Sequence, residues 1–277
     1  MPQSYCEYIK NINPTIKHGL ISVVGRVAMH PKMYVGTLIQ LGYKPFPLEA
    51  KKMLFSNKIV QVYPSSFKYF GHIFKEDGII GLYNGLLPSI IEVLVDLFVR
   101  HELEKNKIKN ESDVKDVSEI LYPAFWNNLP GRAKKIIKEC FTVTVSTIIS
   151  YPFNCIMVRM MASFVGKETS YNSIFSAASQ IYKVGGFSEF YKGFFPKLTY
   201  TLLLAISGHM LFDLFELNKT LKFIACEKIN SEWCSKIAMK PLTILAYPLL
   251  TVSNVMIINN TKFSTNFGII NNPNFYH

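Results

Sequence analysis

The sequence predicts an all-α membrane protein, a bundle of transmembrane helices built from tandem repeats. Hydrophobic residues make up 49% of the 277-residue chain and charged residues only 18%, which is below the roughly 25% of ordinary globular chains. No formal charge occurs from Phe141 to Val158 or from Pro241 to Thr261, and about 20 apolar residues can cross a bilayer core. A pattern of proline followed by an aromatic-x-Gly turn also recurs along the chain, and such repeats define a fold.

The repeated pattern is most complete in the first two of its three occurrences. The first runs from His30-Pro31 to Tyr83-Asn84-Gly85, and the second from Tyr151-Pro152 to Tyr191-Lys192-Gly193. The third shows only its beginning, Tyr247-Pro248. A proline inside a helix removes a backbone hydrogen bond and bends the helix. We therefore expect structural kinks at Pro31, Pro152 and Pro248. The tyrosines and glycines of the turns are expected to be structural.

Five long apolar segments are expected to be membrane-crossing helices. They span about residues 17–41, 87–104, 133–164, 194–217 and 232–260. Between the first two, Phe67, Phe70 and Phe74 recur at helical spacing, which predicts a short amphipathic helix over Ser66–Phe74 on the membrane surface. Polar and turn-forming residues follow position 260, so we expect a polar tail over 261–277 and no sixth segment.

Several classes of function are disfavoured by the composition. The net charge of +11 is spread over the connections, whereas nucleic-acid binding predicts one basic face with interleaved aromatics. Basic loops beside anionic headgroups explain the charge better. The five cysteines show no C-x-x-C spacing, which disfavours a zinc site or a disulfide framework. No secretory or transit signal is expected in residues 1–13.

Motifs of covalent chemistry are not apparent. The sequence has no Walker-type glycine loop, no G-x-S-x-G, no H-E-x-x-H and no paired histidines at metal-ligand spacing. We therefore expect no catalytic residue, no metal, no cofactor and no enzymatic activity.

Taken together, these features resemble the mitochondrial carrier superfamily. Its repeat consists of a kinked helix with Pro-x-acid-x-x-base-x-base, an acid-Gly pair, an aromatic-base-Gly triplet and a second helix. The resemblance implies one carrier-like transmembrane domain over residues 1–277. Repeat 1 spans about 16–107, repeat 2 about 131–217 and a truncated repeat 3 about 232–260. A mitochondrial-carrier-like bundle around a polar cavity is implied, with the sixth helix missing.

The acid–base pairs that close the cavity of transporting carriers are absent from this sequence. The acidic positions hold Met33, Asn154 and Leu250, and the basic positions that follow hold Gly36, Met157 and Ser253. Gln40 and Arg159 remain from the pattern. A working alternating-access carrier is therefore not expected.

The chain resembles the mitochondrial carrier homolog branch in particular. The shared motifs are His30-Pro31-x-x-Tyr34-Val35, Leu38-Ile39-Gln40-x-Gly42-Tyr43-x-Pro45 and Tyr247-Pro248-x-x-x-Val252-Ser253-Asn254-x-Met256. This resemblance implies a multi-pass protein of the outer mitochondrial membrane. It also implies insertion of tail-anchored and other α-helical proteins, lipid scrambling, and docking of a BCL-2-family protein.

Polar residues on the apolar segments suggest how insertion could work. An unpaired ionisable side chain in hydrocarbon costs ~2.5 kcal/mol or more, so such residues should face a wet interior. With the sixth position vacant, that interior would be a hydrophilic groove open to lipid. The groove-lining candidates are Arg26, Glu92, Asp96, His209, Asp213, Lys240, Tyr247 and Asn254.

Each candidate has a plainer alternative. Ionisable residues can form intramembrane ion pairs or reach the headgroups. Hydroxyl residues often only pack or bond across a helix interface, and this alternative is favoured for Thr142, Ser146, Ser150, Thr243 and Thr251. His30, beside a helix kink, is expected to bond the backbone.

Three functions therefore remain in competition. The first is an insertase for tail-anchored clients, with membrane lipids as further partners and lipid scrambling through the same groove. The second is a degenerate solute carrier that exchanges a small anion. The third is a receptor or scaffold for a BCL-2-family partner.

Overall fold

The computed structural model describes residues 14–53, 56–62, 64–109, 130–166, 171–217, 231–259 and 261. Within these ranges, only the backbone is described for residues 14–18, 53, 56–57, 106–109, 166, 212–217 and 231–238. The prediction of a polar tail without a sixth segment falls on residues 261–277, almost all of which lie outside the described residues.

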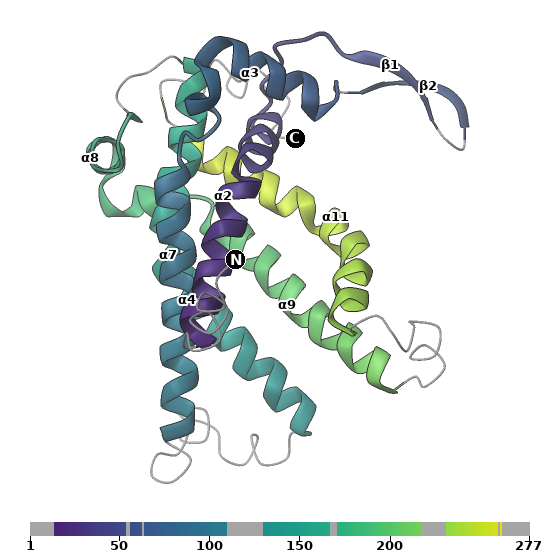
Figure 1. Cartoon of the computed structure of the whole chain (residues 1–277), viewed down its shortest axis with the longest axis vertical. Helices are drawn as coiled ribbons and strands as arrows, with labels where there is room; N and C mark the ends of the chain where they lie inside the picture. The colour runs from purple at the N-terminus through teal and green to yellow at the C-terminus, as the bar shows by residue number, and fades with distance from the viewer. Residues whose placement is uncertain are drawn as a thin grey trace, which may run out of the picture. The chain divides into compact units, whose positions relative to one another are not determined.

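Each of the five predicted segments coincides with one long helix (Figure 1). The helices are α2 (Pro14–Gln40), α4 (Leu86–Lys109), α7 (Gly131–Gly166), α9 (Phe194–Leu217) and α11 (Ser231–Ile258). Pro31, Pro152 and Pro248 lie inside α2, α7 and α11. The helical fold class is confirmed, and the spans are located to within a few residues.

Two shorter helices occupy equivalent places in the first two predicted repeats. α3 (Ser66–Gly81) contains the predicted amphipathic segment, and α8 (Ile174–Gly185) precedes a 3-10 turn, η2 (Gly186–Tyr191). Each buries two side chains one turn apart, Tyr69 and Ile73 in α3 and Ala177 and Ile181 in α8. The sequence reading did not predict α8 or η2.

A β-hairpin in the first connection was also not predicted. Strands β1 (Glu49–Met53) and β2 (Ser56–Val62) pair in antiparallel register, with Lys52 opposite Ile59 and Lys51 opposite Val60. In Figure 1 the hairpin extends from the start of α3. The described chain is therefore helical apart from this one insertion.

The turn into α4 is held by the residue before Pro31. His30 is fully buried, and its Nε2 donates to the Asn84 carbonyl at 3.1 Å. Its ring stacks on Tyr83, with centroids 6.0 Å apart and 10° between the planes. The Asn84 side-chain amide donates to the Met160 carbonyl of α7 at 2.8 Å. The prediction that His30 bonds the backbone is confirmed.

The turn into α9 is held in the same way by the residue before Pro152. The Tyr151 hydroxyl donates to the Lys192 carbonyl at 2.6 Å. The Tyr151 ring stacks on Tyr191, with centroids 6.0 Å apart and 24° between the planes. Corresponding positions of the two predicted repeats therefore make corresponding contacts.

Glycine is required in both turns because of backbone conformation and close approach. Gly85 has φ 79° and Gly193 has φ 75°, a region that L side chains rarely adopt. A Cβ on Gly85 would lie 3.1 Å from the Met157 carbonyl oxygen, and one on Gly193 would lie 2.4 Å from that of Ser253. The predicted structural role of these glycines is confirmed.

By length and composition, the described residues contain two helices able to cross a membrane. They are residues 131–165 of α7 and 239–258 of α11, and the bent pair formed by α3 and α4 raises the number to three. α4 is less apolar because it contains Glu92, Asp96 and Arg100. The five predicted crossings therefore remain a prediction.

The chain forms two compact units that do not follow the repeat boundaries. One unit contains residues 1–94, 151–192 and 254–277, and the other contains residues 95–150 and 193–253. Each unit combines parts of all three predicted repeats. The units are described separately below.

Replacing Gly193 with alanine should destabilise the protein by about 2–4 kcal/mol, because a left-handed L residue and overpacking both cost free energy. The matched control is Gly36→Ala, since a Cβ on Gly36 of α2 meets nothing within 4 Å. That change should be neutral or stabilise by about 0.5–1 kcal/mol. Thermal unfolding of both variants in detergent measures the difference, and equal unfolding temperatures would contradict the close approach.

Candidate functional site

The ends of α2, α7 and α11 meet in one unit through fixed polar contacts. The Asn254 side-chain amide of α11 donates to the Gln40 side-chain oxygen of α2 at 2.5 Å. Arg159 of α7 donates from Nε to the Ile257 carbonyl of α11 at 3.0 Å. We call this region the junction; it contains Gln40, Arg159, Glu189, Asn254 and Ile257.

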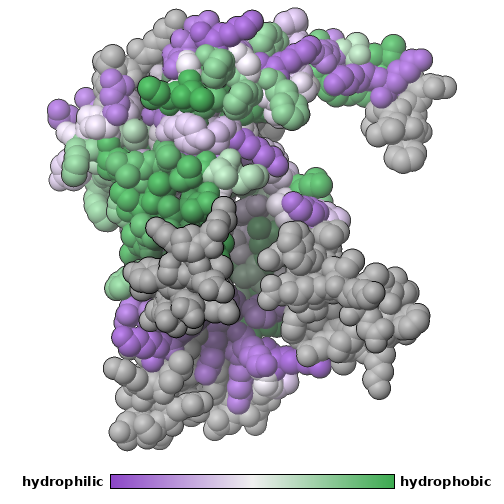
Figure 2. All heavy atoms as spheres, in the orientation of Figure 1, coloured by the Kyte–Doolittle hydropathy of each residue, from purple (hydrophilic) through white to green (hydrophobic). Residues whose placement is uncertain are grey.

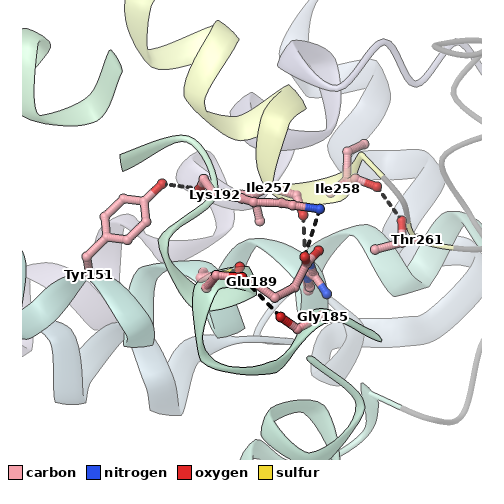
Figure 3. Close-up of polar contacts among 10 residues, drawn as sticks. Tyr151, Gly185, Glu189, Lys192, Ile257, Ile258 and Thr261 are labelled. Atoms are coloured by element: carbon pink, nitrogen blue, oxygen red, sulfur yellow. Dashed lines mark hydrogen bonds and ion pairs between the residues drawn. The ribbon is translucent and has the colours of Figure 1, made fainter. Parts of the chain in front are cut away.

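Arg159 is the charged centre of the junction. Its side chain is completely buried, and Nη2 lies 2.5 Å from Oε1 of Glu189, which is itself 2% exposed. The other Glu189 oxygen lies 2.7 Å from Nζ of Lys192. Figure 3 shows the Glu189 carboxylate beside the Lys192 amine and close to Ile257 of α11. A buried carboxylate with two basic partners compensates the buried guanidinium.

Apolar side chains surround these polar contacts. Those with at most 1% exposure at the junction are Tyr34, Leu38, Leu41, Met161, Ala162, Ile257 and Ile258. Separating α11 from α2 and α7 would break the buried Asn254–Gln40 and Arg159–Ile257 hydrogen bonds, and leaving buried polar groups unpaired is costly. Among the described residues, these bonds hold the three helix ends together.

Positions that hold acid–base pairs in transporting carriers make packing contacts in this chain. Met33 Sδ lies 3.0 Å from Nη1 of Arg26. The carbonyls of Met157 and Ser253 lie against Gly85 and Gly193, as described above. The Ser253 hydroxyl donates to the Gly193 carbonyl at 2.7 Å. The side chains at these positions supply no charge that could open and close a cavity.

Two of the groove-lining candidates form an ion pair with each other. Nη2 of Arg26 on α2 lies 3.6 Å from Oε2 of Glu92 on α4. The side chains are 24% and 13% exposed. The structure brings these candidates together as the alternative of an intramembrane ion pair predicts.

Asp96 belongs to a second charged group, in the other compact unit. Nε of Arg100 lies 2.9 Å from Asp96, and Nη1 lies 3.3 Å from Glu139 of α7. About one third of each side chain is exposed. The sequence reading did not identify Glu139, although its charge just before the charge-free run of α7 is a visible signal.

The remaining candidates differ in their surroundings. Lys240 is exposed, Tyr247 is 42% exposed and His209 is half-buried. The Asp213 side chain lies outside the described residues. Asn254 is 5% exposed and bonded within the junction. Tyr247 and Lys240 are thus the described candidates on α11 that remain accessible.

Hydroxyl residues on the predicted polar stripes bond their own helices. Thr142 donates to the Lys138 carbonyl at 3.0 Å and Ser146 to the Val143 carbonyl at 3.2 Å. On α11, Thr243 and Thr251 donate to carbonyls one turn earlier, at 2.9 and 3.2 Å. These bonds lie within single helices, so both groove lining and the alternative of a contact across a helix interface stay predictions for these four residues.

No metal centre is apparent in the part of the chain that the structure describes. There, no group of three or more histidine, cysteine, aspartate or glutamate side chains lies close enough to hold an ion. The two charged groups described above contain arginine, which cannot ligate a cation.

Comparison with known proteins supports the resemblance. The family model described as mitochondrial carrier protein matches residues 133–220. Mitochondrial carrier homolog 2 of Homo sapiens is 28% identical over 242 residues, covering 84% of this chain and 77% of that protein. The Mus musculus protein of the same name is 27% identical over 237 residues, with the same two coverages. Mitochondrial carrier homolog 1 of Mus musculus is 26% identical over 264 residues, covering 83% of this chain and 62% of that protein.

These similarities confirm the resemblance to the mitochondrial carrier homolog branch. Together with the apolar helices, they support a carrier-type protein of a mitochondrial membrane.

Replacing Glu189 with alanine should destabilise the protein by about 3–5 kcal/mol, because it leaves the buried Arg159 without its carboxylate. The double variant Arg159→Met/Glu189→Leu should lose much less, since it removes both charges. Denaturant unfolding in detergent compares the two.

The control for this experiment is Glu102→Gln, which breaks an exposed pair with Lys105 at 4.0 Å and should change little. A single variant as stable as the double variant would show that Arg159 does not depend on Glu189.

Proposed function

Because the chain is similar to mitochondrial carrier homologs over most of its length, we propose that it inserts tail-anchored and other α-helical proteins into the outer mitochondrial membrane. The proposed path is a hydrophilic groove between the spans that opens to lipid. A client's polar end moves along the groove while its apolar helix stays in the acyl region. Lipid headgroups follow the same path, which gives scramblase activity.

The closed junction is the observation that carries this proposal. Alternating access requires the ends of the helices to separate, and separation here takes the Ile257 carbonyl away from Arg159 and Gln40 away from Asn254. No acid–base pair remains at the signature positions to offset that cost. An activity that works while the junction stays closed therefore fits the chain better than alternating access does. A groove that accepts cargo from its side meets this requirement.

Accessible polar groups on α11 support the groove. Lys240 and Tyr247 are seven residues apart, hence on the same face of the helix, and both are exposed or nearly half-exposed. Carrying polar groups through hydrocarbon is costly because water is absent there. Side chains of this kind, with the water they hold, lower that cost for a short polar tail. No bond is made or broken, so no catalytic residue is needed.

Reversing the charge at Lys240 should lower client insertion several-fold, because the groove then repels acidic tails and loses a cation that solvates lipid phosphates. The measurement is insertion of a purified tail-anchored protein into vesicles that contain the reconstituted chain. Lys105→Glu, at an exposed lysine of α4, is the matched control. Equal insertion by wild type and Lys240→Glu would contradict the proposed path.

Cross-linking the junction distinguishes this function from solute exchange. Gln40→Cys/Asn254→Cys, in a background with the five native cysteines replaced by alanine, should be bridged by a short bis-methanethiosulfonate, which reduction removes, because the ends of the two native side chains touch. Insertion should persist after bridging, since the groove works with the junction closed. Loss of activity that returns on reduction would instead favour an alternating-access carrier.

A further inference from the structure

The β-hairpin is an addition to one repeat. His30 and Asn84 are 54 residues apart, whereas Tyr151 and Lys192, which make the corresponding contact, are 41 residues apart. The difference of thirteen residues is close to the length of the hairpin, which runs from Glu49 to Val62. The second repeat therefore makes the corresponding turn, into α9, without such a hairpin. Insertions into single repeats often carry binding surfaces.

The hairpin has little internal support. It consists of two strands, and within the described ranges no third strand joins them. An isolated two-stranded hairpin is at best marginally stable in water. Its link to α3 is the ion pair between Lys68 and Glu49, at 2.5 Å. The hydrogen bond from Lys68 lowers the pKa of the Glu49 carboxyl, so the pair stays charged at neutral pH.

Positive charge is concentrated in and around the hairpin. Residues 44–77 contain six lysines and three acidic residues, Glu49, Glu76 and Asp77. Lys51, Lys52 and Lys58 are exposed on the strands, and Lys51 also lies 3.5 Å from Glu49. Figure 2 shows hydrophilic residues along the visible side of the hairpin, with hydrophobic ones beside them.

Exposed apolar side chains accompany this charge. Ile59 is 68% exposed and Val60 39% exposed on β2. On α3, Phe67, Phe70 and Phe74 are 87%, 40% and 48% exposed. Their spacing of three and four residues places them on one face, with Lys68 and Lys75 at one edge and the exposed Asp77 at the other. An exposed aromatic face edged by lysines is typical of helices that lie in a membrane interface.

We propose that the hairpin and α3 together form a surface that docks on anionic lipid headgroups. The docking surface consists of Lys51, Lys58 and Val60, which share one face of the hairpin because Lys51 is opposite Val60, and the three phenylalanines of α3. The lysines bind lipid phosphates or carboxylates, and the apolar side chains enter the interface. An acidic protein would match the charge, but it leaves the phenylalanine face unexplained. The inference does not depend on the insertase activity.

Hydrogen exchange of the full chain in vesicles tests this inference. We expect the backbone amides of the hairpin to exchange about ten-fold more slowly in vesicles containing phosphatidylserine than in pure phosphatidylcholine, because docking stabilises a marginal element. Lys51→Gln/Lys58→Gln should remove the difference, and Lys183→Gln, at an exposed lysine of α8, should preserve it. The effect should also weaken as salt screens the headgroups.

The exchange rates of the wild-type hairpin in the two kinds of vesicle decide the outcome, even if a variant unfolds the hairpin. Equal exchange rates in the two kinds of vesicle would overturn the inference. So would protection that appears only after a soluble acidic protein is added. Unchanged insertion in phosphatidylcholine vesicles would leave the proposed function intact, so the two proposals can fail separately.

Discussion

A buried guanidinium imposes the strictest requirement on this chain. Arg159 cannot lose its charge at physiological pH, so its surroundings must provide compensation wherever it lies away from water. Here the compensation comes from a carboxylate on η2 and a carbonyl at the end of α11. Three elements that are distant in sequence are thereby fixed to one point. The apolar packing of the junction and the paired helix ends follow from that arrangement.

The carboxylate that satisfies this requirement is displaced from its usual place in the repeat pattern. Gly185 occupies the acidic position before Gly186, and Glu189 lies one turn later, its Oε2 2.7 Å from where a Gly185 Cβ would be. Repeat 1 shows the reverse order, with Asp77 at the acidic position and Gly81 one turn later. A Cβ on Gly81 would lie 2.3 Å from the Asp77 Cβ. Both repeats therefore combine one acidic residue with one glycine, in opposite order.

The long helices could be predicted because their signal is local. Continuous hydrophobicity and a few turn residues located all five long helices to within a few positions. Glu189 was missed because its importance depends on Arg159, 30 residues earlier, and spacing alone does not reveal that contact. Thr142 and Ser146 have the spacing of a polar stripe, but a hydroxyl can equally bond its own helix. The hairpin was missed because its strands are short, rich in lysine and without a clear turn dipeptide.

α11 differs from α7 in how much of it the protein covers. In the apolar windows of the two helices, 61% of α7 is buried and only 22% of α11. Contacts at the end of α11 fix its position there, while the described residues leave most of its apolar window uncovered. Hydrophobic mismatch should therefore tilt α11 more readily than α7 when bilayer thickness changes. As a result, the tilt of α11 should differ between membranes of different thickness.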